Sequence, residues 1–592
     1  MTLLASMSGP RPAALAQSAP DPDLVGLRAI GTPADPKVDA VWNRYLDYEG
    51  YTSLARRLAE AHPDLVRVQS IGTSTEGRDM SVLIVTDHST GDHRDKPGFW
   101  IDGGIHANEM QGTNFAMYTA WYLAESHGHI GFITRLLQDK TFYILPSVSP
   151  DSRENFIYGP NTANSSRSGM RPFDDDGDGR VNEDLADDLN GDGHITMMRR
   201  RSPVGRWKED PEFPARMVPA GPDEQGEYEM LGQEGIDNDG DGRVNEDDHG
   251  RYDPNRDWAW GWQPDYVQRG ALFYPGSLVE TRNIKGFVMD HPNIAGAQSY
   301  HNYGGMFLRG AGAREDQGFY DRADDAVYDL IGEQGEKMIP GYNYYVIWRD
   351  LYTVYGGEID WFSLARGIYT FSNEINTSYR LFHERSTEGR YQNKEFNEFD
   401  KYLLFGDGYI DWTPFDHPQY GPIEIGGSKK NYIRNTPGFM LEEEGHRNMA
   451  FTILHAYHTP KLDVADIRVE PLGGGLSQVT ATVVNHRAMP THSSHDLKYK
   501  IERPDLITLE GADVVAGMIV QDPDLGLATE QKTDPATLRV ANIPGTVTAG
   551  SGAVENLVRV RWVVEGNPRS LTVTVDSRKG GVVTGEWSSR RR

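Results

Sequence analysis

The chain has 592 residues, too many for one hydrophobic core, so two or three domains are expected, and no apolar run reaches the roughly 18–20 residues of a membrane-spanning helix. Lys and Arg number 59 against 87 Asp and Glu; the formal net charge of −28 argues against a nucleic-acid-binding protein, which needs a basic surface. Cysteine is absent, which excludes disulfides, thiolate metal sites and cysteine nucleophiles and leaves His, Asp and Glu as metal ligands.

The N-terminal segment has features of an export signal. Ala14, Leu15 and Ala16 form a small-residue pattern before Gln17, like that cut by a signal peptidase, although the stretch lacks a basic start. We therefore expect residues 1–37 to be a signal remnant or a disordered segment, and the protein to be secreted or periplasmic.

The next part of the chain alternates between strand and helix patterns. Residues 38–62 predict a helix that ends before Pro63. Strand patterns follow in LVRVQSIGTS, RDMSVLIVTD, KPGFWIDGG and TFYILPSVS, with the apolar helix NFAMYTAWYLAE before the last of them. This alternation predicts an α/β domain with a mixed sheet, whose ligand sites lie beyond strand ends.

Two changes of pattern divide the remainder. Residues 160–250, rich in Gly, Asp, Asn and Pro, interrupt the alternation and predict a large loop insertion in a domain that spans 38–460. An amphipathic helix is predicted over 441–457, before Pro460. Residues 461–592 then predict an all-β sandwich with a structural or adhesive role and an unknown partner, from the strand patterns VADIRVEPL, SQVTATVVN, LKYKIE, NLVRVRWVVEG and SLTVTVDS.

His106 and Glu109 stand three residues apart just after a predicted strand. A His-x-x-Glu pair can supply two of the three protein ligands of a hydrolytic zinc site, but alone it is a weak signal because a chance match is expected. Four further motifs follow in order, namely YDPNRDW (252–258), SYHNYGG (299–305), YTVYGGEIDW (352–361) and YTFSNE (369–374). Together the five motifs resemble the carboxypeptidase A family of zinc carboxypeptidases over about residues 40–455.

The resemblance implies a fold and a metal centre. The expected fold is an α/β domain with a mixed eight-stranded sheet flanked by helices. His106, Glu109 and His301 match the Zn²⁺ ligands. Asp253 matches the carboxylate that orients the first histidine, which fixes its tautomer and raises its basicity.

The same resemblance implies a substrate site for peptides with a free C-terminal carboxylate. Asn255 and Arg256 match the pair that binds this carboxylate, for which the planar fork of arginine is suited. Tyr352 matches a mobile tyrosine that closes over the substrate. Glu374 matches the general base that takes a proton from water and delivers it to the leaving amine. Ile359 matches a specificity position, where an apolar residue predicts an apolar or aromatic preference.

The arginine that would stabilise the oxyanion is less certain from the motifs. The family places it before the Asn-Arg motif, in the region enlarged here by the insertion, so Arg199 is the first candidate and Arg171 the second. Asn108 departs from the family, because many members have arginine within the His-x-x-Glu turn.

The insertion contains three segments that resemble Asp-x-Asp-x-Asp-Gly calcium loops, at 174–184, 188–193 and 237–247, the first and third nearly identical. Oxygen ligands at alternate positions with glycine at the sixth suit Ca²⁺, although no segment is a complete EF-hand. We expect at least one Ca²⁺, which could order one wall of the active site. The candidate ligands are Asp174, Asp176, Asp178, Asp188, Asn190, Asp192, Asp237, Asp239 and Asp241, with Asn182, Glu183, Asn245 and Glu246 closing the loops.

Three functions are compatible with these observations. The first is a zinc-dependent metallocarboxypeptidase that hydrolyses the C-terminal peptide bond. The second keeps the metal centre and is an amidase on cell-wall peptides or N-acyl amino acids, because the Asn-Arg pair fits any substrate with a free carboxylate. The third is an inactive calcium-dependent binding protein, against which the intact His106, Glu109, His301 and Glu374 argue.

Overall fold

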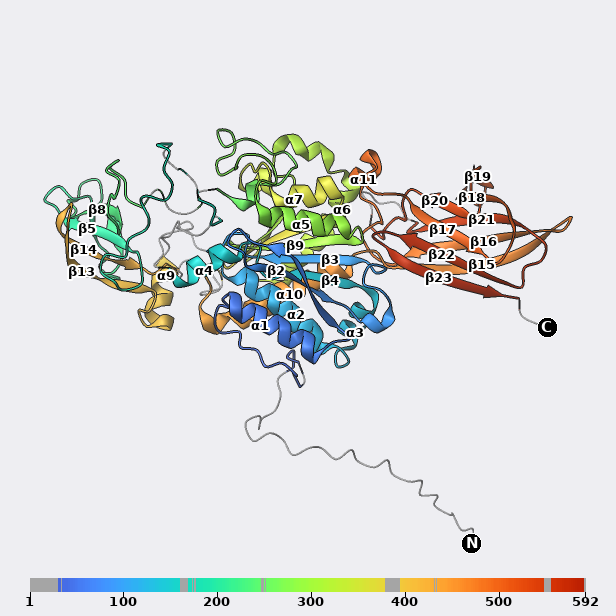
Figure 1. The fold of residues 1–592 in the computed structure, drawn as a ribbon, viewed down its shortest axis with the longest axis horizontal. Helices are drawn as coiled ribbons and strands as arrows, with labels where there is room; N and C mark the ends of the chain where they lie inside the picture. Colours follow the sequence, from blue (N-terminus) through green and yellow to red (C-terminus); the bar gives the residue numbers. More distant parts are fainter. Residues whose placement is uncertain are drawn as a thin grey trace, which may run out of the picture.

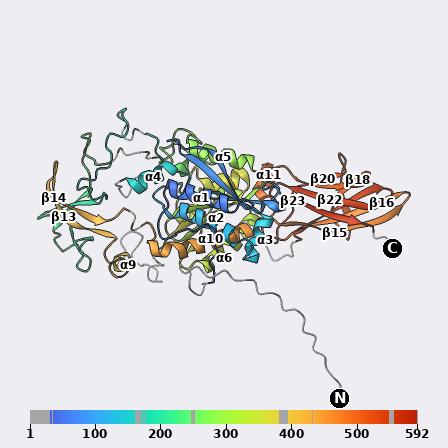
Figure 2. The ribbon, with the colours of Figure 1, turned by 60° about the horizontal axis from the view of Figure 1, so that its bottom comes forward.

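Three bodies lie in a row in the computed structural model of this chain (Figure 1): a six-stranded sheet, a central α/β body and a β-sandwich. The same order is seen after a turn of 60° about the long axis (Figure 2). The structure describes residues 30–33, 35–159, 169–172, 174, 177–245, 247, 250, 252–377, 379, 394–430, 432, 434–547 and 555–589.

The central body is built on an eight-stranded mixed sheet, as the resemblance implied. The strand order is β1-β2-β4-β3-β9-β12-β10-β11, with β4, β3, β9 and β12 parallel to one another. The strands are β1 (Val66–Thr73), β2 (Asp79–Val85), β3 (Gly98–Gly103), β4 (Thr141–Leu145), β9 (Ile294–Asn302), β10 (Met306–Arg309), β11 (Asn343–Val346) and β12 (Tyr369–Ile375).

Helices cover both faces of this sheet (Figure 1), so the apolar side chains of each strand are buried on two sides. On one face lie α1 (Tyr48–Ala61), α2 (Gln111–Ser126), α3 (Gly131–Asp139), α6 (Arg322–Met338) and α10 (Leu441–Tyr457), and on the other α5 (Val279–Asp290) and α7 (Glu358–Asp360). The predicted helix 441–457 is therefore confirmed. The helix predicted over 38–62 begins later, because the Asp47 side chain accepts a hydrogen bond from the Gly50 N–H and caps α1 there.

The region predicted as a loop insertion contributes strands to a separate antiparallel sheet. This sheet has the order β13-β14-β5-β8-β6-β7 and combines two distant parts of the chain. Strand β5 pairs with β14 more than 220 residues away, for example Arg199 with Glu424. A local pattern cannot show such pairing, which is why the expectation of loops alone was wrong. The strands are β5 (Met197–Arg201), β6 (Trp207–Glu209), β7 (Met217–Pro219), β8 (Tyr228–Gln233), β13 (Tyr409–His417) and β14 (Gly421–Ser428).

The shorter helices lie beside these elements: α4 (Pro150–Tyr158) follows β4, α9 (Lys394–Phe399) precedes β13 along the chain, and α11 (Ser494–Tyr499) lies in the C-terminal region. The prediction of a strand at LKYKIE was wrong, because Ser493 accepts a hydrogen bond from the Asp496 N–H and begins helix α11 there.

The C-terminal region forms the expected antiparallel β-sheets, a five-stranded one with the order β15-β16-β21-β18-β19 and a four-stranded one with the order β20-β17-β22-β23. Alternate residues of both sheets meet in one core that contains Trp562. The strands are β15 (Leu462–Gly473), β16 (Leu476–Asn485), β17 (Asp505–Glu510), β18 (Val514–Asp522), β19 (Leu527–Gln531), β20 (Thr537–Val540), β21 (Leu557–Glu565), β22 (Ser570–Ser577) and β23 (Gly581–Ser588).

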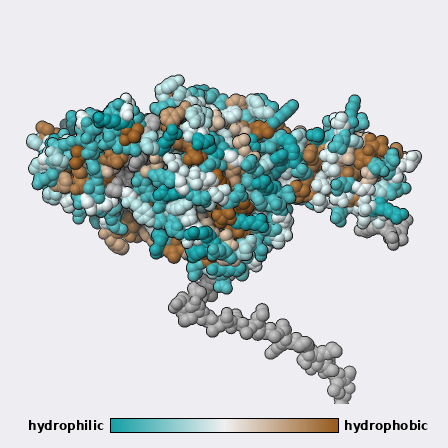
Figure 3. Space-filling view, viewed as in Figure 1, coloured by the Kyte–Doolittle hydropathy of each residue, from teal (hydrophilic) through white to brown (hydrophobic). Residues whose placement is uncertain are grey.

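Hydrophilic residues cover most of the face seen in Figure 3, and hydrophobic residues show in small groups between them. No helix in the described ranges combines the length and the apolar character needed to cross a membrane. The candidate signal site at residues 14–16 lies outside the described residues.

Buried polar contacts join the sandwich to the central body. Lys579 is 4% exposed, and its Nζ donates to the backbone carbonyls of Arg366 and Gly367 at 2.9 and 2.7 Å. Next to it, His492 lies between two buried carboxylates, with Nδ1 2.9 Å from Asp496 and Nε2 3.3 Å from Asp505. Because these carboxylates stabilise the imidazolium, and outweigh the opposing effect of burial, the pKa of His492 is raised to about 9.

This histidine makes stability depend on pH. The folded-state pKa of about 9 exceeds the usual value of 6.5. The contribution of His492 to the free energy of unfolding is therefore complete below pH 6.5 and is lost as pH rises through 9. Its size is on the order of 3 kcal/mol. We expect calorimetry of the full chain to show a C-terminal transition that moves to lower temperature between pH 6.5 and 9.5, and His492→Gln to remove most of this dependence. An equal pH dependence in the variant would contradict the assignment.

Candidate metal and substrate site

The metal-binding motif lies where strand β3 passes into helix α2. Two glycines allow the helix to begin directly against the sheet: a Cβ on Gly103 would lie 2.4 Å from the carbonyl carbon of Gly112, and one on Gly112 would lie 2.8 Å from the carbonyl oxygen of Tyr300. The turn between them carries His106 and Glu109, which are 2% and 1% exposed. His301 lies near the end of β9, which neighbours β3 in the sheet.

Three ligand atoms converge at this point. His106 Nδ1 is 3.1 Å from Glu109 Oε1, His301 Nδ1 is 3.1 Å from Glu109 Oε2, and the two Nδ1 atoms are 3.2 Å apart. Two imidazole lone pairs this close to each other and to a carboxylate are stabilised by a cation. The spacings fit a tetrahedral Zn²⁺ site, whose ligands at about 2.1 Å from the ion lie about 3.4 Å apart.

Asp253 lies behind this group. Its Oδ1 is 2.8 Å from His106 Nε2, which leaves Nδ1 of the same ring directed at the other ligand atoms. The same Oδ1 accepts the Asn255 N–H at 2.8 Å. This carboxylate therefore fixes the tautomer and orientation of one histidine and also holds the start of the Asn-Arg segment.

Glu374 stands beside His301, because β12 and β9 are parallel neighbours and the register pairs these two residues. Both line a pocket whose other wall carries the Asn-Arg segment and the 352–360 segment. The structure thus brings together nearly all the candidates from the sequence: His106, Asn255, Arg256, His301, Tyr352, Ile359 and Glu374 line the pocket, and Glu109 and Asp253 contact its histidine.

The Asn-Arg pair is held rigidly. Asn255 Oδ1 accepts the Glu358 N–H at 2.8 Å, and Arg256 Nη1 donates to the Asn255 carbonyl at 2.7 Å. Arg256 is 7% exposed, and its buried Nε has no hydrogen-bond partner among the described residues. A buried guanidinium with an unused donor can bind a carboxylate. Tyr352, by contrast, is 50% exposed at the rim.

Glu358 is a pocket residue that the sequence analysis did not single out. It is 1% exposed, and Ser299 Oγ bridges it to the buried Asp102 at 3.0 and 2.7 Å. Burial, and then the nearby Asp102, hold the pKa of Glu358 well above its usual range. The only signal in the sequence was its place next to Ile359.

Arg199 is not at this site, contrary to the expectation. It lies in β5 of the six-stranded sheet, 3% exposed, with ion pairs to Glu424 at 2.7 Å and Glu209 at 2.8 Å. Its guanidinium is also sandwiched between the rings of Tyr228 and Trp412, at 4.0 and 4.3 Å from their centroids. These contacts occupy the cation within the sheet, so we assign it a structural role.

Arg171, the second candidate, lies beside the metal-site segment. Its backbone N–H donates to the Tyr252 hydroxyl at 2.7 Å, next to Asp253 in the chain, and its guanidinium is 4.9 Å from the centroid of Phe273. A role at the oxyanion stays a prediction for this residue.

The acidic loops fold as compact turns and two of them pair. The Asp174 carboxylate accepts the N–H groups of Gly177 and Gly179, and that of Asp237 accepts those of Gly240 and Gly242. Asp188 forms the same turn with Gly191 and Gly193. An antiparallel bridge joins Asp184 to Asp247 between the two near-identical repeats. Carboxylate oxygens of Asp237, Asp239 and Asp241 lie within 4.8 Å of one another, whereas Asp176 and Glu246 lie outside the described residues.

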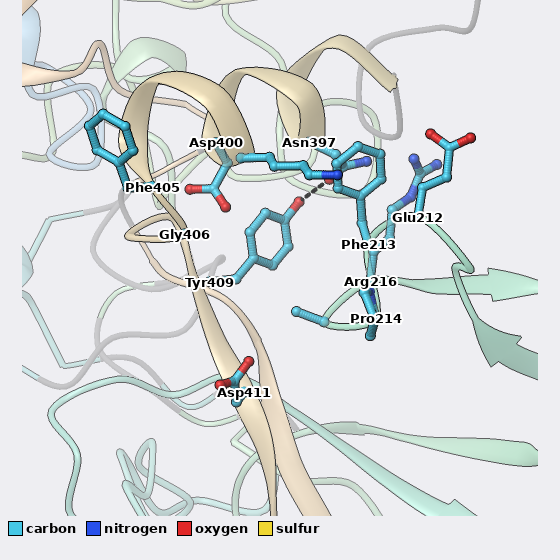
Figure 4. A pocket seen from close by; sticks show the side chains of 12 residues that line it. Glu212, Phe213, Pro214, Arg216, Asn397, Asp400, Phe405, Gly406, Tyr409 and Asp411 are labelled. Carbon is cyan, nitrogen blue, oxygen red and sulfur yellow. Dashed lines mark hydrogen bonds between the residues drawn. The ribbon is translucent and has the colours of Figure 1, made fainter.

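A larger cavity, of about 540 Å³, lies away from the metal ligands between the 212–216 loop and the α9–β13 segment (Figure 4). Two of its polar groups are hydrogen-bonded: Tyr409 donates to Asn397, and Asp400 accepts the Gly408 N–H. Unlike the residues around His106, its described lining residues form no group that could hold a metal ion.

A family of known proteins matches the part of the chain that carries His106 and Glu109. Residues 51–174 match the family model described as zinc carboxypeptidase. The chain thus carries a zinc carboxypeptidase domain. Zn²⁺ is the ion that this family implies, and the His106–Glu109–His301 group fits it. Residues 461–588 of the C-terminal region match a domain family of unknown function.

Individual relatives agree with the family match. Carboxypeptidase B2 of Rattus norvegicus is 37% identical over 135 residues, 22% of this chain and 30% of that protein. A protein of Ajellomyces capsulatus named as an inactive metallocarboxypeptidase is 30% identical over 126 residues, 21% of either chain. The domain therefore matches under a third of the length of these relatives. The carboxypeptidase A structure from Helicoverpa armigera aligns with 70% of this chain and 73% of its own, at 15% identity and a TM-score of 0.41.

The contact between His106 and Asp253 leads to a test on metal binding. Replacing Asp253 by Asn keeps the size of the side chain but removes the negative charge that makes His106 a better ligand. We expect Asp253→Asn to lower the affinity for Zn²⁺ by about 10–100-fold, measured by competition with a chromophoric chelator. Asp290→Asn, at the exposed end of α5, is the matched control. Equal affinities in the two variants would contradict this role.

Proposed function

We propose that this protein is an active metallocarboxypeptidase that removes the C-terminal residue of peptides. The observation that carries the proposal is the pairing of Glu374 with His301 across one pocket from the Asn255–Arg256 pair. A proton acceptor and a carboxylate-binding cation on opposite sides of a metal centre are what hydrolysis of a terminal peptide bond requires.

The Asn-Arg pair would select and orient the substrate. The buried guanidinium of Arg256 would bind the terminal carboxylate through its unused donor. Holding that end would place the scissile carbonyl beside the ligand group, which lowers the entropic cost of reaction. Tyr352, exposed at the rim, would then close over the released residue.

Glu374 would move the proton. Zn²⁺, when bound, lowers the pKa of a coordinated water to about 7 and polarises a carbonyl. The Glu374 carboxylate would accept the proton of the attacking water and later deliver it to the leaving amine. Arg171 is our candidate for the cation that stabilises the oxyanion.

The pocket favours an apolar or aromatic C-terminal residue. Ile359, Leu308 and Ile347 contribute apolar surface to its lining. Burial and the nearby Asp102 raise the pKa of Glu358, which weakens the electrostatic preference of this acid for a basic side chain.

The test is release of the C-terminal amino acid from blocked dipeptides, with and without a zinc chelator. Because general-base catalysis contributes about 10²–10⁴-fold, we expect Glu374→Gln to lower kcat/KM by about that factor while the Zn²⁺ content is unchanged. Glu442→Gln, a change in the exposed first turn of α10, is the control.

The other outcomes separate the alternatives. Bound Zn²⁺ without release from any peptide would favour an amidase acting on cell-wall peptides or N-acyl amino acids. Failure to bind Zn²⁺ would favour the inactive calcium-dependent binding protein; the Ajellomyces capsulatus relative is likewise named as inactive. Secretion stays a prediction that fractionation of producing cells would test.

Ca²⁺ at the acidic loops also stays a prediction. These loops form part of the stretch between β4 and the Asn-Arg motif, so a cation that orders them would also steady one wall of the pocket. We then expect calcium-free, zinc-replete buffer to lower peptidase activity, and added Ca²⁺ to restore it. Full activity without Ca²⁺ would remove this role.

A further inference from the structure

A second guanidinium reaches the metal ligands from a distant part of the chain. Arg434 Nη1 lies 3.5 Å from Glu109 Oε1 and 3.4 Å from the carbonyl oxygen of Asn302, and its guanidinium carbon is 5.3 Å from the centroid of the Tyr303 ring. The side chain is 26% exposed. Nε and Nη2 make no hydrogen bond within the described part of the chain, so most of the donors of this cation are available to a ligand.

The segment that carries Arg434 is hydrogen-bonded to both segments that carry metal ligands and to the segment that carries Glu374. The Arg434 carbonyl accepts the side-chain amide of Asn376, two residues after Glu374, at 3.1 Å. Asn435 Oδ1 accepts the Met110 N–H at 3.0 Å and the side-chain amide of Asn302 at 3.2 Å. The next residue, Thr436, accepts from the Gln111 side chain at 3.1 Å. This arginine is thus a fixed part of the centre.

Arg434 and Arg256 contact different residues around the centre. Arg256 lines the pocket that would take the released residue, together with Tyr352 and Ile359, and Arg434 is not among the lining residues of that pocket. Arg434 instead contacts Glu109 and the Asn302–Tyr303 segment. A peptide held by its terminal carboxylate at Arg256, with its scissile carbonyl at the ligands, continues past the centre, where its acyl portion meets Arg434.

The charges around Arg434 make it able to discriminate between acidic and basic peptides. The net charge of −28 and the carboxylates of Glu374 and Asp253 repel an anionic peptide. An arginine beside these carboxylates offsets the repulsion locally. Its guanidinium can bind a carboxylate of the peptide through two parallel hydrogen bonds. A basic side chain at the same place meets like charge.

We propose that Arg434 is a specificity-determining residue that selects peptides with an acidic side chain in the two residues before the one released. This inference rests on the proposed carboxypeptidase function and adds to it the class of acyl portion that the site prefers.

The test compares acetylated tripeptides that all release phenylalanine and differ only in the residue before it: Ala-Glu-Phe, Ala-Gln-Phe and Ala-Lys-Phe, with Glu-Ala-Phe and Gln-Ala-Phe for the earlier position. We expect the wild-type kcat/KM to be about tenfold higher for a Glu than for the matching Gln peptide, the effect of one partly exposed charged hydrogen bond. Arg434→Gln should remove the difference, and Arg434→Glu should make the Lys peptide the best substrate.

Controls separate selectivity from damage to the centre. Arg447→Gln, which removes an exposed arginine paired with Glu443 on α10, should keep the wild-type ratio. Arg434→Lys keeps the charge, so it should retain part of the Glu preference even where Arg434→Gln folds poorly.

Two results would overturn the inference alone: wild-type activity without discrimination between Glu and Gln peptides, or an Arg434→Gln variant that loses the same factor on every peptide. Wild-type protein that binds Zn²⁺ but releases no phenylalanine would instead overturn the proposed function, and this inference with it.

Discussion

The crowding of three metal-binding side chains in one buried place constrains the central domain. His106, Glu109 and His301 are almost fully buried, and their donor atoms lie 3.1–3.2 Å apart. These side chains stay this close together because the backbone around them holds them in position. The contact between Gly103 and Gly112 supplies that constraint, because it holds the start of α2 against the strand ends from which the ligands come. A cation then converts the crowding into stabilisation.

The six-stranded sheet contributes none of His106, Glu109 and His301, but its strands adjoin along the chain the segments that carry Arg434 and the Asn-Arg motif. Strand β14 precedes the segment that carries Arg434, and β5 to β8 precede the Asn-Arg motif along the chain. Arg199 joins these two strands through its ion pair with Glu424. The pairing of β5 with β14 therefore links the part of the chain before the Asn-Arg motif to the part before Arg434. A buried cation with two carboxylate partners and two aromatic faces is suited to hold such a sheet together.

Buried polar groups lie at the junction of the C-terminal sandwich with the central body, beside apolar contacts such as that of Met489 with the cluster around Phe371. The Lys579 ammonium binds backbone carbonyls of the central body, and the neighbouring imidazolium of His492 is held by Asp496 and Asp505. Each of these groups is buried, so removing one partner leaves another charge without compensation. Such a junction fixes one orientation of the two bodies. The sandwich core itself, around Trp562, is complete without them.

The sequence by itself determined what depends on short covalent spacing. His-x-x-Glu after a strand, Asp-Pro-Asn-Arg, the Glu374 segment and the alternating strands of the sandwich are local patterns, and all of them except the strand predicted at LKYKIE fold as expected. Only the tertiary structure decided what depends on pairing between distant segments. It placed Arg199 in a separate sheet, Arg434 beside Glu109, and Glu358 opposite Asp102. The physical reason is that a charged side chain finds its partner through strand register and loop anchoring, and nothing in its neighbouring residues specifies either of these.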